Sequence, residues 1–367
     1  MAEIDLGALR RNVDAIRAEL GPSGVGVLAV VKADAYGHGA VACARALERK
    51  VWGFAVSLVE EGVELRRSGI ELPIVVLGCY YGQAHRDVVA YRLTPVVGDP
   101  ADLGRFSRAA DELAAARLGV HLKVDTGMSR LGVRPERLSE FIEELGRHPG
   151  VMLAGLCTHL AEADAEDPMP TREQLIRFEA VRAALVAAGL RVGVVHVANS
   201  AALVRFASAR YDLVRPGLAL YGVAPPHSPL RGLWPVMSLK TRVIALREVP
   251  AGTGVSYGGL YRTPGPARIA TLPIGYADGY TRRMTGRAQV LLHGRRCPVV
   301  GAISMDMIMV DVTAVPEVTL GDEAVLLGAQ GSERICIEEM AAWAGTIPWE
   351  VCSTISKRVP RIYTGSG

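Results

Sequence analysis

The first two-thirds of the chain alternate short apolar runs with segments of helical periodicity, and this alternation constrains the fold more than any other feature. The run from Gly26 to Lys32 has the character of a buried strand, and residues 8–20 before it carry apolar side chains at helical spacing. Alternating strands and helices favour a parallel sheet with helical crossover connections. The expected strands lie near 26–32, 52–57, 73–77, 93–97, 118–124, 152–157, 194–198 and 218–221.

Eight strands in about 220 residues fit a (β/α)8 TIM barrel better than an open sheet. Helical patterns such as 60–67 and 171–188 fall between the strands, as this fold requires. A doubly wound open sheet is the alternative that the pattern leaves open. The sequence therefore predicts an α/β fold with an N-terminal barrel.

The character of the sequence changes near residue 230, where helical periodicity fades. Short segments rich in Val and Ile follow, and Gly and Pro interrupt them at close intervals. This pattern predicts a C-terminal domain made mainly of antiparallel β-strands. One helix, Ile337–Ala344, is expected to interrupt it.

Composition excludes several classes of protein. The net charge is only +3, and the basic residues are spread along the chain, which argues against nucleic-acid binding. The N-terminus lacks the pattern of a signal peptide, and no apolar run is long enough to span a membrane. Six cysteines lie far apart without a Cys-x-x-Cys pair, which predicts reduced thiols in the cytoplasm and no metal site.

Lys32 is the first candidate for chemistry, because active-site groups of such barrels lie where the strands end. A turn containing Gly37 and Gly39 follows it, and glycines permit close approach of the backbone to a ligand. A desolvated lysine can form a Schiff base with an aldehyde cofactor. A solvated surface charge is the plain alternative.

Polar clusters follow four more of the expected strands. Side chains alternate along a strand, so Lys123 and Asp125 share one face, near Arg130. An interior ion-pair network that seals the barrel explains this cluster equally well. Ser200 suits either a helix N-cap or a phosphate ligand. The other clustered residues are Thr158, His159, His196, Asn199, Arg215, Pro216, Gly217 and Leu218.

The stretch from Ala29 to Gly39, AVVKADAYGHG, closely resembles the cofactor-attachment motif of alanine racemases. The resemblance extends from Glu3 to Arg361, and the order and spacing of its motifs agree. It includes the β-domain motifs Val255-Ser256-Tyr257-Gly258, Ile274-Gly275-Tyr276-Ala277-Asp278-Gly279-Tyr280 and Ser304-Met305-Asp306. It implies a barrel at 7–229 that binds pyridoxal phosphate. It also implies a β-domain of residues 1–6 and 230–367 that contributes to the partner subunit's active site in a homodimer.

The resemblance also implies a role for each matching residue. Lys32 would hold the cofactor and exchange the α-proton on one face of a small amino acid. Tyr257 of the partner would exchange it on the other face. Arg130, Met305 and Tyr276 would serve the substrate. The other cofactor-binding residues would be Tyr36, His159, Asn199, Ser200, Arg215, Gly217 and Leu218. His196, Asp306 and Lys123 would support the site, and Lys123 matches a position that is carbamylated in several relatives.

The expected reaction is the interconversion of L- and D-alanine, which supplies D-alanine for cell-wall synthesis. Racemisation removes a proton from one face and returns it to the other, so it needs two bases. Arg215 favours a racemase over a transaminase, because an arginine cannot readily protonate the pyridine nitrogen it would face.

Alternative functions remain open at this stage. They are a racemase of broader specificity, a pyridoxal-phosphate carrier without a reaction of its own, and a decarboxylase of the same barrel type. The β-domain counts against a carrier, and Arg215 counts against a decarboxylase. Two residues depart from the family pattern: Lys357 stands where many relatives have an aromatic residue, and Ala302 where many have arginine. Both departures concern substrate preference.

Overall fold

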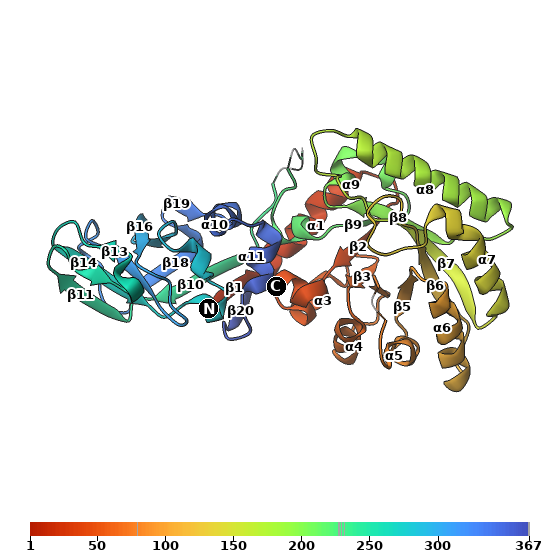
Figure 1. Ribbon diagram of the computed structural model, residues 1–367, viewed down its shortest axis with the longest axis horizontal. Helices are drawn as coiled ribbons and strands as arrows, with labels where there is room; N and C mark the ends of the chain where they lie inside the picture. Colours follow the sequence, from red (N-terminus) through yellow and green to blue (C-terminus); the bar gives the residue numbers. More distant parts are fainter. Residues whose placement is uncertain (79, 227, 229, 231, 366–367) are drawn as a thin grey trace. The chain divides into compact units, whose positions relative to one another are not determined.

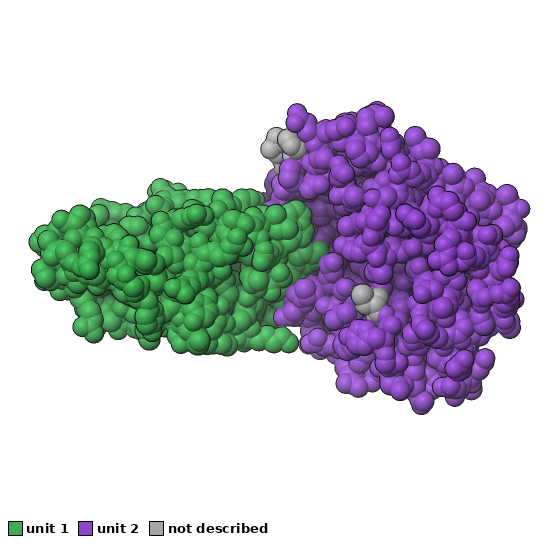
Figure 2. Space-filling view, in the orientation of Figure 1, with its two compact units in different colours: residues 1–8, 36–39, 235–367 green, residues 9–35, 40–234 purple. Residues whose placement is uncertain are grey.

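The computed structural model describes residues 1–78, 80–226, 228, 230 and 232–365. The chain divides into two compact units, coloured separately in Figure 2. One unit comprises Leu9–Ala35 and Ala40–Trp234, and we call it the barrel unit. The other comprises Met1–Ala8, Tyr36–Gly39 and Pro235–Gly367, and we call it the β-unit.

Eight parallel strands form a closed barrel within the described part of the barrel unit (Figure 1). Each strand pairs with the next along the chain, and the first pairs with the last to close the ring. The predicted TIM barrel is confirmed. Its strands are β2 (Gly26–Val30), β3 (Gly53–Val56), β4 (Ile74–Val76), β5 (Thr94–Val97), β6 (Leu118–Lys123), β7 (Val151–Cys157), β8 (Val194–Asn199) and β9 (Leu213–Arg215).

Helices surround the barrel and cover its strands (Figure 1). Leu9, Val13, Ile16 and Leu20 of the first helix are all buried, so the apolar stripe read from the sequence faces the core. The helices are α1 (Leu6–Leu20), α3 (Ala40–Leu47), α4 (Val59–Arg67), α5 (Ala84–Ala90), α6 (Ala101–Glu112), α7 (Leu138–Arg147), α8 (Met169–Ala187) and α9 (Ala202–Arg205).

The prediction of a strand at 218–221 was wrong. The last barrel strand is β9, and the four residues after Gly217 form the 3-10 turn η3 (Leu218–Tyr221). Pro216 has no backbone N–H to extend a ladder, and Gly217 turns the chain with φ −114° and ψ −94°. The apolar run Leu-Ala-Leu-Tyr is buried as expected, but in a different backbone conformation.

The β-unit is built around a ten-stranded sheet among its described residues. Its pairings are antiparallel except for that between the first and last strands of the chain. The strands, in sheet order, are β11 (Ala245–Val249), β14 (Ala267–Leu272), β17 (Ile308–Asp311), β16 (Arg295–Val300), β15 (Gln289–Leu292), β18 (Glu323–Gln330), β10 (Met237–Arg242), β1 (Ala2–Asp5) and β20 (Arg361–Thr364), with β19 (Glu333–Ile335) beside β18. A separate hairpin pairs β12 (Gly254–Val255) with β13 (Tyr261–Arg262).

Two helices accompany this sheet where one was predicted. The predicted helix is α10 (Ile337–Ala344), and the second is α11 (Pro348–Thr354). Pro348 occupies the first helical position, where its missing N–H costs nothing. Seven residues with few apolar positions give too short a periodic signal to be recognised in the sequence.

Two further expectations concern thiols and membranes. Among the described residues, the cysteines at 43, 157, 297, 336 and 352 form no disulfide, and Cys79 lies outside the described residues. Within the described residues, no helix combines the length and the apolar character needed to cross a bilayer.

Candidate active site

Lys32 opens a turn of left-handed helix directly after the strand β2. In this turn, α2 (Lys32–Gly37), the four residues from Ala33 to Tyr36 all have φ between 51° and 54°. A left-handed conformation costs a non-glycine residue about 1–2 kcal/mol, so a run of four must be held by its surroundings. Such strain concentrates at functional sites, and here it immediately follows the candidate lysine.

Glu61 is one of the groups that hold this turn. Its Oε1 accepts a hydrogen bond from the Ala33 N–H at 2.6 Å, and its Oε2 accepts one from the Ser57 N–H at 2.7 Å. The carboxylate thus ties the end of β3 to the residue after Lys32. Sequence reasoning missed Glu61, although its place in the first turn of a helix signals a capping residue.

The second half of the turn is fixed within the β-unit. Arg361 donates to the Gly37 carbonyl from Nε and Nη2, at 3.1 and 3.0 Å. A side chain at Gly37 would collide with the Cys352 carbonyl, and one at Gly39 would collide with the Tyr363 hydroxyl. These two glycines are therefore needed for close packing. Burial raises the pKa of the Tyr36 hydroxyl to about 12, so this phenol stays protonated and can donate.

Lys32 lies in an environment that favours its neutral amine. Burial is the main cause of its lowered pKa, the Arg130 charge adds to it, and Glu61 opposes it. A neutral amine is both a nucleophile and a base, whereas an ammonium is neither. Lys32 is therefore prepared for covalent or proton-transfer chemistry.

Arg215 is buried at the end of β9 with four of its five N–H groups bonded within the barrel. Nη1 donates to His196 Nδ1 at 2.9 Å and to the His196 carbonyl. Nη2 donates to the carbonyls of Thr158 and Val197, at 2.7 and 3.0 Å. Among the described residues, the Nε–H has no acceptor, so it is the one donor that Arg215 can offer to a ligand.

His159 lies among the cations of the barrel unit. Burial lowers its pKa to about 3, and four nearby cations add to the effect. The ring is therefore neutral and suited to stack on a flat ligand. The four cations are Arg215, Arg130, Lys123 and Lys32.

A one-way hydrogen-bond chain fixes the backbone of His159. The Thr158 hydroxyl donates to the Val124 carbonyl at 2.8 Å, so it accepts from the Thr126 hydroxyl at 2.8 Å. Gln174 donates to the Thr126 hydroxyl and to the His159 carbonyl, both at 3.1 Å. Gln174 of α8 is thus a supporting residue that sequence reasoning missed.

Lys123, Asp125 and Arg130 lie together with His159 around a small cavity. Asp125 Oδ1 accepts hydrogen bonds from three backbone N–H groups of the turn that follows it, at 3.0–3.1 Å. Within the described part of the chain, no carboxylate lies at ion-pair distance from Arg130. The pKa of Lys123 is lowered, chiefly by burial, which favours its neutral amine.

Backbone donors and a hydroxyl gather after β8 and β9. Ser200 Oγ accepts from the Gly217 N–H at 2.9 Å, while Asn199 Oδ1 accepts from the N–H groups of Ala201 and Ala202, at 3.1 and 2.9 Å. Asn199 therefore stabilises the turn that leads into α9, and Ser200 faces η3. The Leu218 N–H, the first donor of η3, has no acceptor among the described residues, which makes this turn suitable for an anion.

Besides Tyr36, four candidates lie in the C-terminal part of the β-unit. Tyr257 begins the 3-10 turn η4 (Tyr257–Gly259) and is 73% exposed. The Ser256 hydroxyl before it donates to the Ala302 carbonyl at 2.6 Å, and Ala302 is buried. This bond anchors the segment that presents Tyr257.

Tyr276 and Met305 lie side by side in the β-unit, because the backbone around Tyr276 bonds that around Met305. The Tyr276 N–H donates to the Ser304 carbonyl at 3.0 Å, and the Ala277 N–H donates to the Met305 carbonyl at 3.1 Å. Asp306 accepts from Arg358 at 2.7 Å, so its carboxylate holds the chain just before the last strand.

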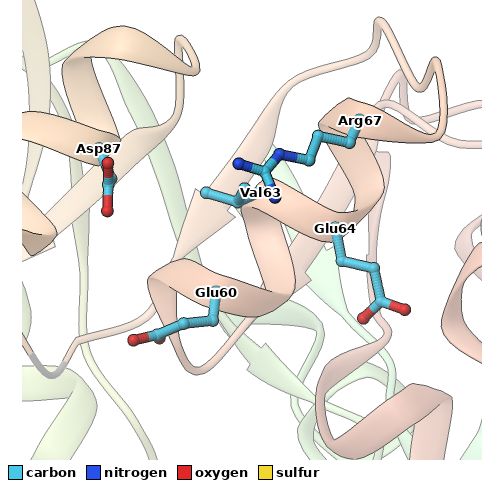
Figure 3. Close-up of a pocket in the computed structure, with 5 residues that line it drawn as sticks. All are labelled: Glu60, Val63, Glu64, Arg67 and Asp87. Carbon is cyan, nitrogen blue, oxygen red and sulfur yellow. The ribbon is translucent and has the colours of Figure 1, made fainter.

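A separate cavity on the outer helices does not coincide with these residues. Figure 3 shows Glu60, Val63, Glu64 and Arg67 along α4, opposite Asp87 of α5. Three carboxylates and one guanidinium would repel an anionic ligand. This cavity therefore does not compete with the strand ends as an anion site.

A closed barrel with a lysine of lowered pKa, a buried arginine and a turn of backbone donors near its strand ends, together with a separate β-unit, is the architecture of a two-domain barrel enzyme. Residues 4–225 match the family model for the alanine racemase N-terminal domain, and residues 236–363 match that for the C-terminal domain. The chain belongs to the alanine racemase family, whose members are amino-acid isomerases.

Individual relatives are similar to this chain over nearly their whole length. The alanine racemase of Sorangium cellulosum is 43% identical, over 99% of this chain and 98% of its own. The structure of alanine racemase from Streptomyces coelicolor superposes with a TM-score of 0.94 at 37% identity, covering 100% of this chain and 98% of that one. That of the Bacillus anthracis enzyme with bound L-Ala-P superposes with a TM-score of 0.92 at 38% identity, covering 100% and 95%.

Proposed function

We propose that this protein racemises alanine with pyridoxal phosphate as its cofactor and with Lys32 and Tyr257 as the two bases. The observation that carries this proposal is the place of Lys32, whose pKa is lowered chiefly by burial and which begins a strained turn just after a barrel strand. A relative from Bacillus anthracis was solved with bound L-Ala-P, which supports a small amino acid as the substrate. The decisive experiment follows the conversion of L-alanine to D-alanine by the purified protein, with L-serine and L-lysine as competing substrates.

The residues of the site fit pyridoxal phosphate group by group. Lys32 would hold the aldehyde carbon through its amine. The hydroxyls of Tyr36 and Ser200 and the N–H groups of Gly217 and Leu218 would bind the phosphate. The remaining Nε–H of Arg215 would donate to the pyridine nitrogen, and Asn199 would brace the turn beside the phosphate. When bound, this cofactor withdraws electrons from the substrate α-carbon and so makes the α-proton removable.

The protein's own groups would then control where the proton goes. The neutral Lys32 amine takes or returns it on one face of the α-carbon, and Tyr257 does so on the other. Arg215 donates a hydrogen bond without giving up a proton, so it leaves the pyridine nitrogen unprotonated. This limits how far negative charge spreads away from the α-carbon, which favours reprotonation there over transamination.

Substrate binding would use the barrel unit of one subunit and the β-unit of its partner. Arg130 and the Met305 N–H would bind the substrate carboxylate, Tyr276 would line the entrance, and His159 would pack against the cofactor ring. Tyr257 is too exposed to lie in a site enclosed by its own unit. We therefore propose a homodimer in which Tyr257 of each subunit completes the partner's site. Six cysteines spaced far apart, without a Cys-x-x-Cys pair, support a location in the cytoplasm, where D-alanine would be made for the cell wall.

We expect Lys123 to carry a carbamate. Its neutral amine can attack carbon dioxide, forming an N–C bond and releasing a proton, and the new carboxylate would give Arg130 the anionic partner that Asp125 does not provide. Protein equilibrated with 13C-labelled bicarbonate should show one carbamate resonance. The resonance should vanish in Lys123→Gln and persist in Lys50→Gln, whose lysine pairs with Asp14 on the surface. An unmodified wild-type lysine would refute the modification.

Lys357 is expected to broaden the choice of substrate. It is exposed and replaces an aromatic residue expected near the cofactor phosphate. Lys357→Tyr should lower kcat/KM for L-serine by about ten-fold and leave that for L-alanine within a few-fold, since one hydroxyl in a pocket is worth roughly 1–3 kcal/mol. Lys357→Met, which has no ring, is the control. An unchanged ratio between the two substrates would mean that Lys357 points away from the pocket.

A further inference from the structure

Two buried histidines continue the hydrogen bonds of Arg215 across the barrel interior. His196 accepts from Arg215 through Nδ1, and its Nε2 lies 2.8 Å from His121 Nδ1. The histidines are 0% and 3% exposed, so water does not compete for these bonds. His121 lies on β6, two residues before Lys123, and nothing in the proposed function uses it.

The direction of every proton in this chain follows from the arginine. A guanidinium can only donate, so His196 Nδ1 must be the unprotonated, accepting nitrogen. A neutral His196 therefore carries its proton on Nε2 and donates it to His121 Nδ1. His121 in turn must carry its own proton on Nε2. The lowered pKa of both rings, to about 4 for His121 and well below the ordinary value for His196, keeps them neutral near pH 7.

The strands make space for His121 at this position. The register between β6 and β7 shifts after Val120, so that His121 pairs with Gly155 and one extra residue, Ala154, bulges between them. A Cβ atom at Gly155 would lie 2.5 Å from Cδ2 of the His121 ring. A Cβ at Gly193 on the other side would collide with the Ala154 carbonyl. The bulge and the two glycines together leave enough space for the His121 imidazole.

We propose that His121 is a positioning residue: by accepting the Nε2–H of His196 it stabilises the tautomer that Arg215 requires, and it thereby helps to direct the one unused N–H of Arg215 towards its ligand. Without an acceptor at His121, His196 can move its proton to Nδ1, and that nitrogen then repels the Arg215 N–H instead of accepting it. The proposal rests on the role of Arg215 in the proposed function, but the tautomer is a property of the protein itself.

The first test is 15N NMR of histidine-labelled full-length protein, with and without added pyridoxal phosphate. The expected spectrum of wild type has His196 protonated at Nε2 only, from pH 6 to pH 8, because Arg215 is present in both states. A His196 protonated at Nδ1 would overturn the proposal. This result does not depend on whether the protein racemises alanine, so it separates a failure here from a failure of the proposed function.

The second test compares His121→Leu with His121→Asn. Asparagine offers an amide oxygen near the place of Nδ1, whereas leucine fills similar space without an acceptor. The His121→Leu variant should show mixed His196 tautomers, because the buried Nε2–H of His196 loses its acceptor. Its kcat should fall by roughly 10- to 100-fold with little change in KM. Asparagine should restore the single tautomer and most of kcat.

Thermal unfolding of both variants checks that they fold. Equal kcat in the two folded variants would show that His121 acts only through packing, which would overturn the proposal. So would an unchanged His196 tautomer in the leucine variant. If the His121→Leu variant does not fold, the comparison of His121→Asn with wild type still tests the proposal. Loss of the Nε2-protonated His196 tautomer in His121→Asn would contradict the proposed role of an acceptor at position 121.

Discussion

Replacing Lys32 with alanine is expected to abolish racemisation and to leave the protein colourless in the presence of pyridoxal phosphate. The loss in kcat/KM should exceed about 10⁴-fold, the upper range for one general base, because the same substitution also removes the covalent attachment of the cofactor. The strained turn after Lys32 supports a functional role for this amine, since four non-glycine residues at positive φ together destabilise the fold by several kilocalories per mole.

The measurement combines a racemase assay with absorbance spectra and borohydride reduction. Reduction of wild-type protein should label the peptide that contains Lys32, and Lys32→Ala should stay unlabelled. Lys50→Ala is the matched control, because it also removes a lysine from the barrel unit but only breaks a surface pair with Asp14. Wild-type protein that gains no absorbance with the cofactor would contradict the whole proposed function.

Much of the fold was predictable because the barrel strands and helices produce alternating apolar runs and helical periodicity in the sequence. Seven barrel strands and the helices near 8–20, 60–67 and 171–188 follow directly from apolar runs and helical spacing. The last strand was misplaced because a short apolar run such as 218–221 looks the same whether it is buried as a strand or as a 3-10 turn. Only the proline and glycine before it, at 216 and 217, distinguish the two, and their effect depends on dihedral angles that a pattern does not contain.

The candidate site was predictable only as a set of polar residues at strand ends. Its organisation depends on long-range contacts. The bonds that Glu61 makes across to Ala33 and those from Arg215 to His196 join residues that are 28 and 19 positions apart. Neither spacing is a local motif. The left-handed turn after Lys32 was equally hidden, because Ala and Tyr rarely adopt positive φ and a single Asp does not signal a run of four such residues.

Tyr257→Phe should be nearly as damaging as the loss of Lys32, if the two residues are bases on opposite faces. Removing the hydroxyl leaves the ring but no proton carrier, so kcat should fall by about 10²- to 10⁴-fold in both directions of the reaction. The cofactor should still bind, because Lys32 and the phosphate ligands are intact. A Tyr257→Phe protein that is yellow but inactive is therefore the expected result, in contrast to the colourless Lys32→Ala protein.

Mixing these two inactive proteins should restore activity, and this is the sharpest test of how the site is assembled. In a heterodimer, one site combines the intact Lys32 of one subunit with the intact Tyr257 of the other, while the second site lacks both. Each heterodimer should then have half of the normal activity. Because random exchange makes half of the dimers mixed, an equimolar mixture should recover about a quarter of the wild-type rate. Mass spectrometry of the native dimers verifies exchange, and a mixture of Lys32→Ala with itself is the blank. If verified heterodimers stay inactive, each site is built within one chain.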